Sequence, residues 1–127
     1  MNGDGRIIVA ELMASGAGGG AQVHVQNLVE GLDPHRFDVE VITLSDGPAV
    51  RRIRTVGGTV HVVDEADDSA ALTGVLALLG ERVPDILHNH MFRAEVIGTR
   101  AALTLAELGV PKPYVVSTIH SSRIRSE

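Results

Sequence analysis

The sequence contains no cysteine and no tryptophan, and aromatic residues make up only 2% of its 127 residues. Without cysteine the chain can form neither a disulfide nor a thiolate-bound metal site, which suits a reducing compartment. It has few aromatic side chains and a formal net charge of −5. It therefore lacks the stacking surfaces and the basic groove that nucleic acids require. We expect no nucleic-acid partner.

Long apolar segments are also absent. The longest stretch without a charged residue, 12–29, contains four glycines and several polar side chains, so it is too polar to span a membrane. Asp4 precedes the first apolar run and Glu11 interrupts it, so a signal peptide is not indicated. We expect a cytoplasmic protein, and peripheral association with a membrane is left open.

The chain has enough hydrophobic residues to form the core of one folded domain. Hydrophobic residues make up 44% of the chain, and a chain of this length can bury a core without covalent cross-links. Glycine is the unusual component, because 14 of the 127 residues are glycine. That is about 11%, against about 7% in an average protein. Four of these glycines fall within residues 16–20.

Five apolar segments typical of buried strands alternate with segments of helical periodicity. The expected strands are residues 6–12, 38–44, 59–63, 86–90 and 114–119, and the expected helices begin near Ala21, Ala49, Asp68 and Phe92. Strands joined by such helices form right-handed parallel crossovers. We therefore predict an α/β fold, a Rossmann-like doubly wound parallel sheet of about five strands. In such sheets, ligands bind beyond the carboxyl ends of the strands.

The glycine segment, residues 16–21, opens the first expected helix. Glycine allows a backbone to approach a phosphate closely, and the amides at a helix start favour negative charge, so we expect an anion-binding loop. The segment also fits the G-x-G-x-x-A pattern of dinucleotide binding, although three residues separate it from the strand and Asp46 is more simply a turn residue. A P-loop is excluded because the only lysine is Lys112. A loop that binds nothing is the alternative.

Histidines follow or end the fourth and fifth expected strands. His88 and His90 are two residues apart in a strand and share one face. A metal would need more ligands than His120 alone adds, so we expect no metal, and we expect His90 to face the cleft. No serine stands in a G-x-S-x-G turn that would make His120 part of a nucleophilic triad. Arg93 could reach an anion, or simply lie on the surface.

The remaining polar candidates are expected to have no specific role. Three arginines of the short second helix should form a solvated face, and two histidines have no evident converging partners. These residues are Arg51, Arg52, Arg54, His35 and His61. His24, in the first turn of the first helix, could either contact a ligand or face solvent.

Taken in order, these segments resemble the N-terminal half of a family 4 glycosyltransferase, the retaining group with the GT-B fold. The matching segments are G-G-A followed by Q-V-H-V-Q-N-L-V-E-G-L, then F-D-V-E-V-I-T-L, D-I-L-H-N-H-M-F-R-A and G-V-P-K-P-Y-V-V-S-T-I-H. The family's usual forms are G-G-A-E-x-x-V, D-[IV]-[IV]-H-x-H and G-V-P…[ST]-x-H-G. The resemblance extends from about Arg6 to Arg123.

The resemblance implies transfer of a sugar from a nucleotide-diphosphate donor to an unknown acceptor, with retention at the anomeric carbon. By position it assigns catalysis to His120, the match of the family's active-site histidine. It assigns substrate binding to Gly18, Gly19, Gly20, His90, Arg93 and Ser121. It implies no metal or other cofactor, because helix ends and basic side chains neutralise the leaving diphosphate.

The chain also departs from the family pattern. Gln22 replaces the usual glutamate after G-G-A, and Ser121 replaces the glycine after the histidine, which leaves the acceptor class open. The family's donor-binding domain, with its E-x7-E motif, would follow position 127. We therefore expect residues 1–127 to be a single acceptor-side domain, inactive without its C-terminal partner domain. The alternatives are a dinucleotide-binding module of an oxidoreductase and a non-catalytic α/β binding module.

Overall fold

The computed structural model describes residues 3–119, which form a five-stranded sheet. The strands are β1 (Ile7–Met13), β2 (Phe37–Thr43), β3 (Thr59–Val62), β4 (Ile86–His90) and β5 (Tyr114–Thr118). All neighbouring strands are parallel, in the order β3-β2-β1-β4-β5. The helices are α1 (Gly20–Gly31), α2 (Pro48–Thr55), α3 (Asp68–Glu81) and α4 (Phe92–Glu107). The predicted Rossmann-like doubly wound sheet is confirmed.

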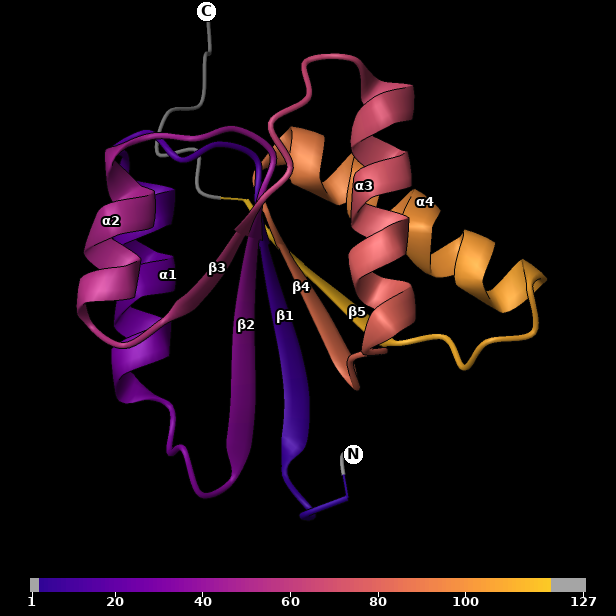
Figure 1. Cartoon of the computed structure of the whole chain (residues 1–127), viewed down its shortest axis with the longest axis horizontal. Coiled ribbons are helices and arrows are strands. Elements are labelled where there is room, and N and C mark those ends of the chain that lie inside the picture. Colours follow the sequence, from indigo (N-terminus) through magenta and orange to yellow (C-terminus); the bar gives the residue numbers. More distant parts are fainter. Residues whose placement is uncertain (1–2, 120–127) are drawn as a thin grey trace, which may run out of the picture.

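The helices cover the sheet in two layers, with α1 and α2 on one face and α3 and α4 on the other (Figure 1). Successive side chains of β1 point alternately into these layers. Ala10 and Leu12 pack with the α3 and α4 core, whereas Met13 packs with the α1 and α2 core. Both faces of β1 are covered, which explains why its sequence is almost continuously apolar. The exception is Glu11, which is buried, with 2% of its surface exposed.

Local signals fix several element boundaries. The Asp67 side chain accepts a hydrogen bond from the Ala70 amide at 2.9 Å and so caps α3. Gly109 follows α4 with a φ of +79°, a conformation that glycine adopts without strain. At the start of β4, the Asp85 carboxylate accepts a hydrogen bond from the Ile8 amide at 2.8 Å. Asp85 therefore aligns the ends of β1 and β4.

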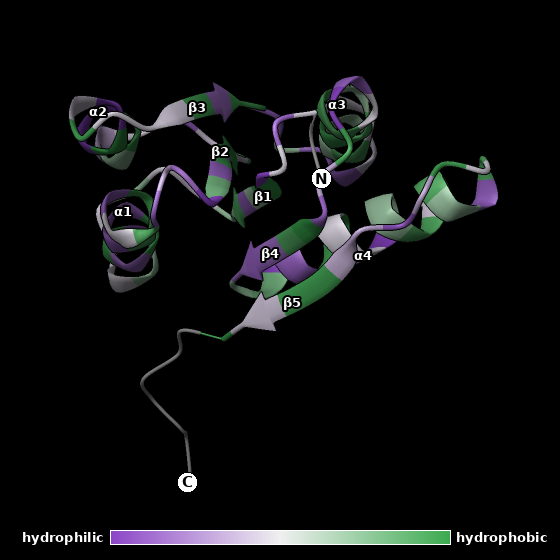
Figure 2. Cartoon of the chain, turned by 90° about the horizontal axis from the view of Figure 1, so that it is seen from below, coloured by the Kyte–Doolittle hydropathy of each residue, from purple (hydrophilic) through white to green (hydrophobic). Residues whose placement is uncertain are grey.

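One face of the sheet is only partly covered within residues 3–119. Figure 2 shows α4 along one side of β4 and β5, while α1 and α2 lie beside the other strands. On the side of β5 away from α4, Tyr114 is 73% exposed and Val116 is 39% exposed. A cavity of about 200 Å³ there is lined by residues that include His88, Leu28 and Val116. Within residues 3–119, no helix has the length and apolar character needed to cross a membrane.

Candidate functional site at the sheet switch point

The strand order reverses between β1 and β4, because the chain leaves β1 toward β2 on one side and later adds β4 on the other. Such a switch point is where doubly wound sheets bind ligands, outside the carboxyl ends of the strands. The glycine segment follows β1, and the start of α4 follows β4. Both therefore lie at the carboxyl ends of the strands, which is the upper end of the sheet in Figure 1.

Backbone contacts hold the glycine segment in place. A Cβ atom added to Gly16 would lie 2.7 Å from the Ser45 carbonyl oxygen, and one added to Gly47 would lie 2.3 Å from the Gly16 oxygen. The Ala49 amide donates to the Gly16 carbonyl at 2.9 Å. Glycine is thus required at two points where the loops after β1 and β2 touch backbone to backbone.

Gln22 fastens the same loop from α1. Its Nε2 donates to the Ser15 carbonyl at 2.9 Å and lies 3.3 Å from the Ser15 hydroxyl, and the residue is buried. The N-cap of α1 is Gly19, which provides no side-chain hydrogen bond, and the first turn contains no acidic residue. The amides at the start of α1 therefore have no side-chain cap, which is the arrangement that favours an anion.

Arg52 adds positive charge at this point, which the sequence did not reveal. A Cβ atom on Gly18 would lie 3.1 Å from the Arg52 NH2 nitrogen, so the guanidinium of α2 lies directly beside the glycine segment. Arg52 is exposed and forms no ion pair with any residue in 3–119. The expectation of a merely solvated face is therefore too simple for this arginine. Arg54 also has a role, because its NH2 donates to the Val60 carbonyl at 2.8 Å.

A largely buried polar cluster lies near the carboxyl ends of β1 and β4, on the α1 side of the sheet. We call Glu11, His88 and His90 the switch-point cluster. Glu11 Oε1 lies 2.8 Å from His88 Nδ1 and 2.6 Å from His90 Nε2. On its other side, His88 Nε2 lies 2.6 Å from Thr118 Oγ1. The His24 ring of α1 packs edge-on against His90, with ring centroids 5.8 Å apart.

Burial and hydrogen bonding act in opposite directions on this cluster. Burial alone raises the pKa of Glu11, but the hydrogen bonds from His88 and His90, together with the positive charge of these rings when they are protonated, outweigh it, so the net pKa is lowered. Burial also lowers the pKa of His90, although Glu11 opposes that shift. Glu11 is therefore the ionised member of the cluster at neutral pH, and His90 is neutral.

The structure corrects the expectation that His90 faces the cleft. His90 is 0% exposed, and its ring contacts Glu11, His88 and His24. Sequence analysis missed Glu11, the partner that draws the ring inward. One signal was available: a carboxylate inside an otherwise apolar buried strand must find a partner. The assignment of His90 to substrate binding stays a prediction.

The switch-point cluster also has the residue types of a metal site, and its three ligand atoms lie within 4.8 Å of one another. In a tetrahedral zinc site with bonds near 2.0–2.2 Å, ligand atoms lie about 3.3 Å apart. The distances of 2.6 and 2.8 Å are shorter and meet at one carboxylate oxygen. This geometry is that of two N–H groups donating to Glu11.

Arg93 extends toward the loop before α3. Its Nε lies 3.0 Å from Asp68 Oδ1, and its NH2 donates to the Glu65 carbonyl at 2.7 Å. The preceding Met91 has a φ of +76°, a strained conformation for a residue other than glycine, directly where β4 ends. Arg93 thus fixes the start of α4, and its predicted contact with a substrate stays a prediction. His120 and Ser121 lie outside the described residues.

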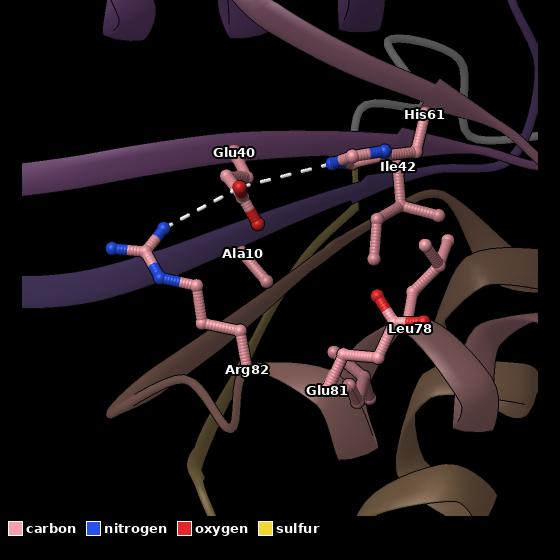
Figure 3. Close-up of a pocket in the computed structure, with 8 residues that line it drawn as sticks. Ala10, Glu40, Ile42, His61, Leu78, Glu81 and Arg82 are labelled. Carbon is pink, nitrogen blue, oxygen red and sulfur yellow. Dashed lines mark ion pairs between the residues drawn. The ribbon is translucent and has the colours of Figure 1, made fainter.

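A second polar group lies toward the amino ends of the strands. We call Asp4, Arg6, Asp38, Glu40, His61 and Arg82 the amino-edge network. Arg82 pairs with Asp38. Figure 3 shows its second pair, with Glu40 at 3.4 Å, and the contact of Glu40 with His61 Nε2 at 3.8 Å. Glu40, His61 and Arg82 border a cavity of about 240 Å³ under α3. His61 therefore does have a converging partner, contrary to expectation.

The sequence matches a known protein family over most of its length. The glycosyl transferase 4-like domain matches residues 19–127, which include the start of α1 and every later element. The chain belongs to this family. The glycosyltransferase family resemblance is thereby confirmed. The sequence has no significant match among the curated proteins.

Solved structures resemble this glycosyl transferase 4-like domain in fold. A UDP-N-acetylglucosamine 2-epimerase superposes with a TM-score of 0.65 and 16% identity over 89% of this chain and 33% of the epimerase. A Listeria monocytogenes protein assigned as a UDP-N-acetylglucosamine 2-epimerase superposes with a TM-score of 0.61 and 12% identity. The match covers 89% of this chain and 31% of the Listeria protein. The chain thus spans about a third of these proteins, and its fold is a Rossmann-like α/β domain that matches these GT-B neighbours.

Proposed function

We propose that this domain is the acceptor-side half of a retaining glycosyltransferase that uses a nucleotide-diphosphate sugar. The observation that carries the proposal is the uncapped start of α1 at the switch point, with the Arg52 guanidinium beside Gly18. Free helix amides and an arginine together suit a diphosphate. The two similar structures are both named for a UDP-sugar, which supports the same ligand class.

In this proposal the glycine segment and Arg52 stabilise the negative charge that grows on the diphosphate as the sugar departs. Gly18, Gly19 and Gly20 contribute backbone approach and amides, and no metal ion or other cofactor takes part. His120 approaches the transferred sugar, with Ser121 beside it. His90 and Arg93 shape the acceptor side, and a second, C-terminal domain supplies most donor contacts.

Dinucleotide binding is the weaker alternative. That function would need a carboxylate after β2 to hold a ribose hydroxyl. The carboxylate of Asp46, which follows β2, instead accepts a hydrogen bond from the Gly47 amide at 2.7 Å. Asp46 is thus engaged in its own turn, as the sequence indicated.

Calorimetric titration of the full-length protein with UDP- and GDP-sugars, UDP and NADH tests the ligand class. We expect a sugar nucleotide to bind, and Arg52→Ala to weaken that binding about 10-fold, the loss typical of one charge-assisted hydrogen bond. Arg51→Ala is the matched control, because Arg51 is also exposed on α2. Tight NADH binding without a response to sugar nucleotides would overturn the proposal.

The reaction itself is tested by NMR of the product. Retention predicts that the anomeric configuration of the donor reappears in the product, and His120→Ala should reduce transfer strongly while donor binding persists. Inversion at the anomeric carbon would refute the retaining mechanism. Transfer that His120→Ala leaves unchanged would remove His120 from the site.

A further inference from the structure

The switch-point cluster joins three adjacent strands at the end where the predicted site residues emerge. Glu11 of β1 is in register with His88 of β4, and His90 of β4 is in register with Thr118 of β5. The cluster therefore connects the carboxyl ends of β1, β4 and β5. None of the motifs that led to the family includes Glu11.

The chemistry of a carboxylate fixes the direction of each hydrogen bond. Ionised Glu11 can only accept, so the two nitrogens that face it, His88 Nδ1 and His90 Nε2, must both carry hydrogen. When His88 is neutral, its Nε2 is then the acceptor for the Thr118 hydroxyl, 2.6 Å away. One carboxylate oxygen thereby selects the tautomer and the orientation of two imidazole rings.

Glu11 and His90 are too deeply buried for water to replace their mutual hydrogen bond. Glu11 is 2% exposed and His90 is 0% exposed. A buried N–H or carboxylate without a partner loses its hydrogen bonds to water and gains nothing in exchange. The lowered pKa of Glu11 is consistent with a carboxylate that stays ionised here.

We propose that Glu11 is a positioning residue for the sugar transfer proposed above, on which this inference rests. It holds His90 at the end of β4 and, through His88, holds Thr118 at the end of β5. Thr118 precedes His120, the predicted catalytic residue, by two positions. Glu11 thus aligns the two strand ends that carry the acceptor-side and catalytic residues, without touching a substrate.

The structural part of the proposal is tested by nitrogen-15 NMR of the imidazole rings in the 127-residue chain. We expect His88 as the Nδ1–H tautomer and His90 as the Nε2–H tautomer. Glu11→Gln should keep both, because one amide oxygen can still accept from both rings. Glu11→Met has a side chain of similar length but no acceptor comparable to the carboxylate, and should shift His88 toward the Nε2–H tautomer.

Val75→Ala is the control for general destabilisation, because Val75 is buried under α3 on the opposite face of the sheet. It should leave both tautomers unchanged. A wild-type His88 in the Nε2–H form would overturn the proposal even if Glu11→Met does not fold. So would tautomers that Glu11→Met leaves unaltered.

The functional part is tested by steady-state kinetics of the full-length protein. We expect Glu11→Met to lower kcat about 100-fold with donor KM changed only a few-fold, as for a misplaced reacting group. Glu11→Gln should restore kcat to within about 10-fold of wild type, and Val75→Ala should leave it unchanged. Absence of transfer by the wild type overturns the proposed function. Transfer that Glu11→Met does not impair overturns only the role of Glu11.

Discussion

Two groups of charged and histidine side chains lie at opposite ends of the same sheet, and their surroundings differ. In the switch-point cluster, Glu11 and His90 are almost completely buried. In the amino-edge network, the side chains of Arg82, Asp38 and Glu40 keep 33%, 20% and 30% of their accessible surface. The same residue types thus form a desolvated hydrogen-bonded group at one end and solvated ion pairs at the other.

We expect burial, more than the number of contacts, to decide how much each group contributes to the free energy of unfolding. The amino-edge network has more members and more ion pairs. However, water and salt screen exposed charges, and each exposed pair contributes little. A buried carboxylate with two donors has no solvent to replace a lost partner.

The largest expected difference comes from removing Glu11. Glu11→Met should lower the free energy of unfolding by about 3 kcal/mol, because the buried His90 and the partly buried His88 both lose the acceptor of an N–H group, at roughly 1–3 kcal/mol each. Urea unfolding at pH 7.5 measures this, with Glu11→Gln as the control that keeps an acceptor. A loss no greater than that for Arg82→Met would remove the distinction between the two groups.

A smaller effect is expected from pH. The folded pKa of His90 is lowered below its usual value near 6.5, so the unfolded state takes up a proton first as pH falls. The stabilisation is present above pH 6.5 and is lost as pH falls from there toward the folded pKa. The carboxylate of Asp38 has a pKa lowered by its hydrogen bond from Arg82, so it stays ionised over this range.

Unfolding free energies at pH 7.5 and pH 5 should therefore show a decrease in the wild type that His90→Gln reduces. His61→Gln, in the amino-edge network, should keep the wild-type decrease. The titratable groups that act on the pKa of His90 include Glu11, His88 and His24. A decrease that depends on His61 and is independent of His90 would reverse the assignment.

Removing Arg82 should have a weaker effect. Arg82→Met should lower the free energy of unfolding by about 0.5–1 kcal/mol, because the partly exposed pairs with Asp38 and Glu40 are screened by water and the methionine keeps the apolar stem packed. Urea unfolding at pH 7.5 measures it beside Glu11→Met. A loss above about 2 kcal/mol would place the network among buried, hydrogen-bonded groups.

The smallest expected difference between the two groups is the effect of salt on their coupling energies. In a double-mutant cycle of Arg82→Met and Asp38→Asn, the coupling energy should fall by a few tenths of a kcal/mol between about 0.1 M and 1 M NaCl. A cycle of Glu11→Met and His88→Gln, in which each variant removes the hydrogen bond between the two side chains, should keep its coupling energy. Equal salt sensitivity in both cycles would contradict the difference in solvation.

The fold was predictable because its signals are local. Apolar strand segments, the Asp67 cap and the glycine after α4 each depend on a few neighbouring residues, and the structure contains all of them. The glycine segment was likewise recognisable, because its composition alone favours an anion-binding loop. The position of Arg52 beside the glycine segment was not recognisable, because its approach to Gly18 depends on how the loops after β1 and β2 pack.

The switch-point cluster shows the same limit more sharply. His88 and His90 share a face, as their spacing predicted, but their partner lies 77 and 79 positions earlier in the chain, at Glu11. Only the register of β1 against β4 brings these residues together. The expected orientation of His90 was wrong because that register was unknown.

The contact between Gly16 and Gly47 has a mechanical consequence for ligand binding. Because the two loops touch backbone to backbone, with the Ala49 amide bonded to the Gly16 carbonyl, a movement of the glycine segment at Gly16 should displace the start of α2. A diphosphate that draws the helix amides toward itself would therefore carry the arginine of α2 along. Amide hydrogen exchange in both loops should slow together when a ligand binds, because the two loops would then be stabilised as one unit.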